Sequence, residues 1–147
     1  MVDSRAKGRD AEQQLAKILR DELGEDLVQR TGFQQAAAGG FDLLLPGIGL
    51  EVKRHARVTE GLLRGWWAQT VSQGKAGRML GALAYRGNQQ EWRIMVPLLK
   101  NADENGQILC DIKIEYANTM FVEGFCYWYR ETIDVEGIEE GIKGIVH

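Results

Sequence analysis

The stretch that decides the fold runs from residue 39 to residue 54 and reads Gly39-Gly40-Phe41-Asp42-Leu43-Leu44-Leu45-Pro46-Gly47-Ile48-Gly49-Leu50-Glu51-Val52-Lys53-Arg54. Its two apolar runs lie on either side of Pro46-Gly47, and a Pro-Gly pair between such runs is a turn signal. The stretch therefore predicts a β-hairpin with its tip at Pro46-Gly47.

This tip fixes a register that places two acids opposite each other. The expected cross-strand pairs are Leu45 with Ile48, Leu44 with Gly49, Leu43 with Leu50, and Asp42 with Glu51. Because side chains alternate between the two faces of a strand, one face is expected to be apolar and to carry Phe41, Leu43, Leu45, Ile48, Leu50 and Val52. The opposite face is expected to carry Asp42, Leu44, Gly49, Glu51 and Lys53. A three-residue loop or a bulge would break this pairing.

Asp42 and Glu51 are the first candidate site residues. Facing residues of an antiparallel pair have Cβ atoms about 4.5–5.5 Å apart, and like charges placed there repel each other. Two such carboxylates favour a cation between them, and Mg²⁺ suits the position because it takes oxygen ligands and keeps several waters. Lys53 would lie beside the ion as a mobile positive charge. The Val52 carbonyl is a further candidate ligand, since it follows Glu51 on the same strand.

The combination of Asp42 with Glu51-Val52-Lys53 on a hairpin resembles the motif of the PD-(D/E)xK nuclease superfamily, and within it the Holliday-junction resolvases and related phage nucleases. Phe41 stands where that motif has its leading Pro. The resemblance implies an α/β, restriction-endonuclease-like fold with an αβββαβ core, in which a mixed central sheet is flanked by helices. It also implies Mg²⁺ (or Mn²⁺) as the cofactor.

A first helix is predicted upstream, over residues 3–23, from an apolar stripe at Ala11, Leu15, Ile18, Leu19 and Leu23. Glu12 lies at the edge of this stripe, so its carboxylate is expected to point toward the sheet. In the resembled family a Glu of the first helix completes the metal site, and Glu12 is the matching position; a border Glu without a role is the alternative. Arg5, Lys7 and Arg9 are candidates for phosphate contacts or for a merely solvated helix start.

The segment after the hairpin carries basic residues and a second helix. Arg54, His55 and Arg57 are candidates for nucleic-acid binding, although a lone His just beyond a strand is commonly a surface group. A broad apolar stripe predicts a helix over residues 60–74. Members of the resembled family often carry a Gln on this helix near the active site, which makes Gln69 a candidate for orienting water or a phosphate.

The other predicted strands complete the core. They cover residues 27–31, 79–85 and 92–96, and Pro97 ends the last of them. The predicted order is therefore helix, three strands, helix and two strands. This is the core order of the resembled fold, and it spans residues 4–97.

The remaining residues, 98–147, are expected to form a C-terminal extension of one domain that covers the whole chain, 1–147. The pattern predicts an added strand over residues 108–116, a helix that starts near residue 118 or 119, and a loosely held tail over residues 136–147. Cys110 and Cys126 are far apart and belong to no Cys-x-x-Cys motif, so we expect buried free thiols and neither a disulfide nor a zinc site.

Charge is distributed unevenly along the 147 residues, whose formal net charge is −3. Residues 1–100 hold fifteen Lys and Arg against eleven Asp and Glu, whereas residues 101–147 hold three against ten. The first part is therefore expected to bind a polyanion and the acidic last third to face away from it or toward a partner. No apolar run approaches the 18 residues of a membrane span, and no signal-peptide core follows the charged N-terminus, so a soluble cytoplasmic protein is expected.

Together these features predict a Mg²⁺-dependent endodeoxyribonuclease that hydrolyses phosphodiester bonds in DNA. The resemblance implies preference for branched DNA, as in a Holliday-junction resolvase, action as a homodimer, and a role in phage DNA recombination or repair. A restriction-like or repair nuclease on duplex or single-stranded DNA is one alternative. A non-catalytic nucleic-acid-binding accessory protein on the same fold is another.

Overall fold

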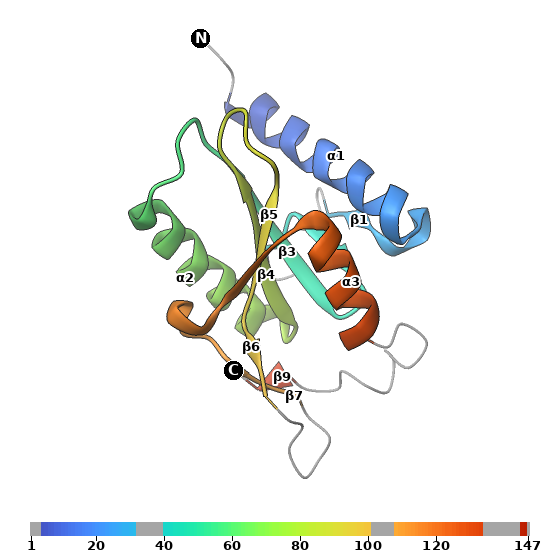
Figure 1. Cartoon of the computed structure of the whole chain (residues 1–147), viewed down its shortest axis with the longest axis vertical. Helices are drawn as coiled ribbons and strands as arrows, with labels where there is room; N and C mark the ends of the chain where they lie inside the picture. The colour runs from blue at the N-terminus through green and yellow to red at the C-terminus, as the bar shows by residue number, and fades with distance from the viewer. Residues whose placement is uncertain (1–3, 32–39, 101–107, 134–144, 147) are drawn as a thin grey trace.

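The computed structural model describes residues 4–31, 40–100, 108–133 and 145–146, which form a mixed α/β structure (Figure 1). The core elements, in chain order, are α1 (Ser4–Leu23), β1 (Gln29–Arg30), β2 (Leu43–Leu45), β3 (Ile48–Arg54), α2 (Glu60–Gly77), β4 (Leu80–Arg86) and β5 (Arg93–Val96). A short 3-10 turn, η1 (Glu25–Leu27), separates α1 from β1. The predicted order of helix, three strands, helix and two strands is confirmed.

The central sheet is mixed, as predicted, and has six strands in the order β1-β2-β3-β4-β5-β8, where β8 is Asn118–Phe121. Only β3 and β4 are parallel to each other, because α2 connects them as a crossover helix, whereas the other neighbours are antiparallel. Helix α2 covers one face of the sheet, and α1 and α3 (Val122–Thr132) lie on the other (Figure 1).

The hairpin register around Pro46-Gly47 is confirmed for three pairs. Leu45 pairs with Ile48, Leu44 with Gly49, and Leu43 with Leu50. The apolar residues of this hairpin that face α1 are fully or almost fully buried, since they belong to the larger core cluster with Leu15, Leu19 and Phe125. A smaller cluster of Trp67, Leu83, Tyr85 and Met95 fills the face under α2.

The fourth predicted pair, Asp42 with Glu51, is not part of the ladder. The Asp42 N–H donates to the Leu50 carbonyl at 3.0 Å, one residue short of Glu51, so the chain bends there as it does at a β-bulge. Phe41 is consequently on the opposite face from the one predicted. Its ring lies so close over Gly49 that a Cβ there would come within 2.1 Å of it, and it also approaches Gly81, which contacts α2.

The C-terminal extension differs from the prediction in two places. The strand near residue 108 is β7 (Ile108–Asp111), which ends before a 3-10 turn, η3 (Ile114–Tyr116), and belongs to a small sheet with β6 (Leu98–Leu99) and β9 (Ile145–Val146). Residues 118–121 form the edge strand β8 instead of the first turn of a helix, which begins at Val122. Pairing with β5 outweighs helix propensity here. Residues 136–144 and 147 of the predicted tail lie outside the described residues.

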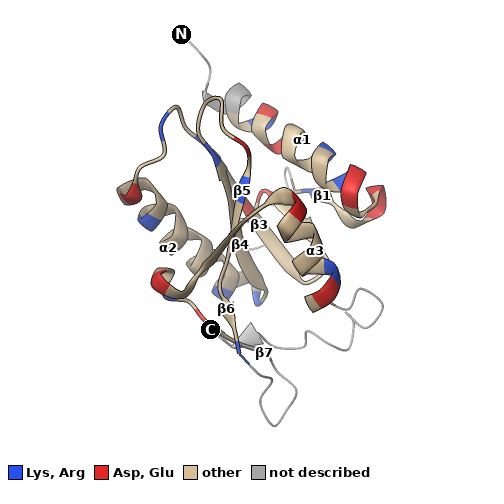
Figure 2. Ribbon diagram, viewed as in Figure 1, with Lys and Arg blue, Asp and Glu red and all other residues tan. Residues whose placement is uncertain are grey.

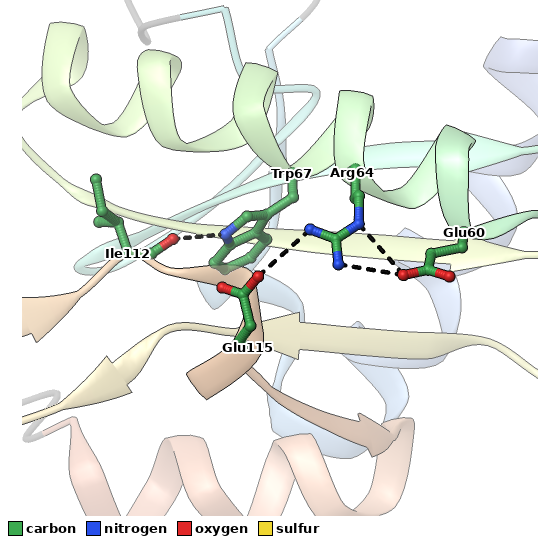
Figure 3. A network of polar contacts seen from close by, with 5 residues as sticks. All are labelled: Glu60, Arg64, Trp67, Ile112 and Glu115. Carbon is green, nitrogen blue, oxygen red and sulfur yellow. Dashed lines mark hydrogen bonds and ion pairs between the residues drawn. The ribbon is translucent and has the colours of Figure 1, made fainter.

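Polar contacts attach this extension to the core. The Trp67 indole N–H donates to the Ile112 carbonyl at 2.8 Å, and beside it Arg64 bonds both Glu60 of its own helix and Glu115 of η3 (Figure 3). On the other side of the sheet, the buried Tyr129 of α3 donates its hydroxyl to the Pro46 carbonyl at the hairpin tip. The extension therefore covers both faces of the core.

Cys110 and Cys126 are buried free cysteines, as predicted. Within the residues described, no helix has the length and apolar character that crossing a membrane requires.

Candidate active site

Three carboxylates from three elements meet where β2 and β3 separate. Glu12 comes from α1, Asp42 precedes β2, and Glu51 lies in the middle of β3. Asp42 and Glu51 are buried, with only 8% and 4% of their surfaces exposed, and Glu12 is half-buried. The structure brings these three predicted residues together, although Asp42 does not pair with Glu51 in the ladder as the register predicted.

The bend at Asp42 explains how its carboxylate comes to lie near Glu51. Val52 would pair with the Phe41 backbone if the ladder continued, but its N–H donates instead to the Asp42 carboxylate at 2.8 Å. The Phe41 carbonyl accepts from the Thr31 hydroxyl at 2.6 Å, so Thr31, directly after β1, holds the displaced segment. The Asp42 carboxylate thus occupies the place of a missing ladder partner, in the gap between the two strands.

The electrostatics of the three acids are unfavourable when no cation is present. Burial and then the neighbouring charge of Glu51 raise the pKa of Asp42 to about 6, against the opposing effects of the Val52 N–H and Lys53. Burial and then the charge of Asp42 also raise the pKa of Glu12, while Arg30 opposes this rise. The protein therefore keeps like charges together in a place where water screens them poorly.

Glu51 has unequal partners for its two carboxylate oxygens. Lys53 Nζ lies 3.2 Å from Glu51 Oε1, and 28% of the Lys53 side chain is exposed. Glu51 Oε2 is buried, and no described group hydrogen-bonds to it. A buried carboxylate oxygen without a partner is costly, so a ligand that supplies positive charge would relieve this cost.

These residues fit a divalent cation without forming a complete cage. In the part of the chain that the structure describes, no group of three or more His, Cys, Asp and Glu side chains is arranged as a ready metal site. Mg²⁺ does not need one, because it usually keeps several waters and binds through one or two carboxylates together with substrate phosphates. Asp42 and the unpartnered Glu51 Oε2 supply oxygen donors of this kind.

The structure adds three residues that the sequence reasoning missed. Arg30 of β1 lies 3.4 Å from Glu12 and partly neutralises it, and Thr31 fixes the segment before Asp42. Gln73 of α2 donates to the Gly40 carbonyl at 3.3 Å, while its side-chain oxygen is buried without a described partner. Only Gln73 had a signal in the sequence, as a second Gln one turn after Gln69.

The remaining predicted residues surround the site less closely. Gln69 is exposed on α2, so Gln73 is the glutamine of this helix that contacts the segment before Asp42. Among the predicted nucleic-acid contacts, Arg9, His55 and Arg57 are exposed and Arg54 is half-buried. The side chains of Arg5 and Lys7 lie outside what the structure describes.

Charge is separated in space as well as along the chain. Figure 2 shows basic residues on the loop between β3 and α2, next to the end of β3 that carries Lys53, and acidic residues at the end of α1 and on α3. This arrangement leaves the acidic surfaces on helices that flank the sheet. The loop after β3 is therefore the better position for contact with a polyanion.

Comparison with models of protein families gives a match over most of the chain. Residues 3–127 match the family model described as "Phage putative PDDEXK endonuclease". Neither the curated proteins nor the solved structures include a match to the chain. The matched range contains α1, α2 and the first half of α3, together with the six-stranded sheet and every candidate site residue.

Proposed function

The chain belongs to this family of phage PDDEXK endonucleases, and from that premise we propose that it is a metal-dependent DNA endonuclease whose active site contains Glu12, Asp42, Glu51 and Lys53. One observation carries the proposal. Asp42 and Glu51 are buried against each other, and a Glu51 oxygen has no described partner. A purely structural site would have little reason to keep this costly arrangement, whereas a site that binds a cation needs it.

Asp42 and Glu51 would hold Mg²⁺ or Mn²⁺ directly. The Val52 carbonyl is an additional candidate, because the N–H and C=O of one strand residue point to the same side and the Val52 N–H points toward Asp42. Glu12 would support the site through Asp42 or provide a further ligand. A bound divalent ion lowers the pKa of water and neutralises charge that develops on the phosphate.

Other side chains would contact the substrate or position the metal ligands. Lys53 is anchored by Glu51 but partly exposed, so its ammonium can reach a substrate phosphate and stabilise the growing negative charge. Arg30 would keep Glu12 ionised and oriented. Gln73 would hold the backbone before Asp42, whereas Gln69, which is exposed, remains a candidate for contact with water or phosphate.

Cleavage of labelled DNA tests the assignment. The wild-type protein should cut in Mg²⁺ and lose activity in chelator, and Glu51→Gln should lose at least about 100-fold in rate, the effect typical of removing a main electrostatic group. Glu60→Gln is the matched control, since Glu60 is an exposed glutamate that pairs with Arg64. Equal cleavage by wild type and Glu51→Gln would refute the proposed site.

We further propose branched DNA as the preferred substrate and a homodimer as the active form. Both come from the likeness of the Asp42, Glu51 and Lys53 motif to that of resolvases. Comparing a four-way junction with a linear duplex of matching sequence tests the preference, and light scattering of the full chain tests the dimer. Equal rates on both substrates would favour a restriction-like or repair nuclease, and DNA binding without cleavage would favour an accessory protein.

A further inference from the structure

Two arginines lie side by side at the carboxyl ends of the parallel strands. Arg54 of β3 pairs in register with Arg86 of β4. Neighbouring residues in register point to the same face of a sheet. Both arginine side chains therefore extend from the face that α1 covers. Like charges at adjacent positions repel each other unless other groups compensate them.

The described contacts leave this pair without negative charge. No carboxylate of the described residues lies within 4.0 Å of either guanidinium. The Arg54 Nε is buried and has no hydrogen-bond partner in the described part of the chain. Arg64 is a useful contrast, since it contacts two glutamates although it lies on an open helix surface.

Neutral groups nevertheless hold Arg86 in a defined position. Its Nη1 donates to Gln14 Oε1 at 2.9 Å, and its guanidinium lies 5.8 Å from the centre of the Trp92 ring. The Trp92 indole donates to the same Gln14 oxygen at 3.2 Å. Arg86 also lines a cavity of about 540 Å³ between the β4–β5 connection and the start of α3, where Glu91 and Glu123 line the wall but form no ion pair with it. A fixed guanidinium with its charge unpaired is prepared for an external anion.

The pair lies one residue beyond the proposed active site along β3 and β4. Arg54 follows Lys53 directly, and Arg86 follows Tyr85, the register partner of Lys53. The two arginines therefore extend from the face under α1, while Lys53 extends from the face under α2. Ligands of sheets with parallel strands bind at the carboxyl ends of those strands. Helix α1 serves both places, because Glu12 interacts with Asp42 while Gln14, two residues later, holds Arg86.

We propose that Arg54 and Arg86 together bind a phosphate of the DNA strand next to the phosphate that is cleaved, and that Gln14 and Trp92 position Arg86 for this contact. The inference rests on the proposed nuclease function and extends it to the path of the substrate, across the ends of β3 and β4. A phosphate between the arginines would accept hydrogen bonds from both and remove their repulsion.

Binding measurements on full-length protein test this site separately from cleavage. In a Lys53→Ala background with Mg²⁺, the dissociation constant for a DNA duplex is measured at several salt concentrations after Arg54→Gln, Arg86→Gln and both changes. Each single change should weaken binding about tenfold and reduce the slope of log K against log salt by about one. Because both arginines share one phosphate, the double variant should lose little more than either single variant.

Gln14→Glu provides a variant that keeps the local packing. A glutamate oxygen can accept from both Arg86 and Trp92, as the glutamine does, but it adds a negative charge that neutralises Arg86. It should therefore weaken DNA binding and flatten the salt slope while the melting temperature stays unchanged. Arg64→Gln is the control and should leave both unaffected, since Arg64 is already paired.

The outcomes separate the two proposals. If binding and slope are the same in Arg54→Gln, Arg86→Gln and Gln14→Glu as in their background, the phosphate site is refuted, whatever the wild type cleaves. If the wild type does not cleave DNA in Mg²⁺ or Mn²⁺ but these variants weaken DNA binding in the predicted way, the phosphate site stands and the nuclease function fails.

Discussion

Two groups of charged side chains in this protein are organised in opposite ways. Glu12, Asp42 and Glu51 bring three acids together, two of them buried, with Lys53 paired to one oxygen of Glu51. The second group consists of Glu60, Arg64 and Glu115, all exposed, with the arginine bonded to both acids (Figure 3).

The difference separates a role in function from a role in structure. In the exposed group each charge has a partner, and water screens the interactions between the charges. These ion pairs therefore contribute little to the free energy of folding. In the buried group the repulsion is real and one carboxylate oxygen lacks a partner. Such a group persists only because the surrounding fold holds it in place. A bound cation would remove the repulsion between the carboxylates, and this relief would add to the free energy of cation binding.

The largest contrast should come from removing one basic residue in each group. Lys53→Ala is expected to reduce the cleavage rate at least about 100-fold, because the charge that stabilises the transition state is lost, while DNA binding and folding persist. Arg64→Ala should cleave at the wild-type rate. Single-turnover rates of the two variants on the same DNA measure the contrast, and normal cleavage by Lys53→Ala would show that Lys53 is not catalytic.

Asp42→Asn should reveal the cost of the buried acids. The amide can still accept from Val52 but removes the repulsion with Glu51, so the metal-free variant should be more stable than the wild type, by on the order of 1–3 kcal/mol. Wild-type protein should gain about 2.7 kcal/mol at a Mg²⁺ concentration 100 times the dissociation constant, and the variant should not. Thermal melts with and without Mg²⁺ measure both effects, and an equal Mg²⁺ gain in the variant would remove Asp42 from the metal site.

The pH dependence of the metal-free protein should follow from the same acid. The folded-state pKa of Asp42 is about 6, above its ordinary value of 3.8, so the native state binds this proton more tightly than the unfolded state does. Its contribution to stability is therefore complete below about pH 4 and is lost as the pH rises through 6. Chemical denaturation between pH 4 and 7.5 should show this loss in the wild type, a smaller one in Asp42→Asn, and a reduced one when Mg²⁺ is added.

The exposed group should give the smallest effect. Glu60→Gln removes an ion pair between neighbouring turns of α2, and Glu115 continues to bond Arg64. The unfolding temperature should change by no more than its experimental error, and high salt should make even this difference disappear. A large loss of stability would mean that the attachment of η3 to α2 depends on this pair more than on Trp67 and Ile112.

Much of this site could be predicted because it depends on local periodicity. Pro46-Gly47 determines the hairpin tip, and the period of two then fixes the three pairs Leu45 with Ile48, Leu44 with Gly49 and Leu43 with Leu50. The 3.6-residue period of α1 likewise places Glu12 at the border of its buried stripe. By contrast, the bend at Asp42 depends on bonds to Thr31 and Val52, which are ten or more residues away.

The sequence by itself determined the order of the core elements, three of the four predicted hairpin pairs and the identity of the acids that come together, because these follow from spacing along the chain. The tertiary structure decided how the acids meet and where Phe41 packs. It also decided that Arg30 contacts Glu12, that Gln73 contacts the segment before Asp42, and that Arg54 and Arg86 lie side by side at the ends of β3 and β4. It also turned residues 118–121 into an edge strand. The physical reason is that such contacts join distant segments, whose relative positions are set by the packing of the whole core.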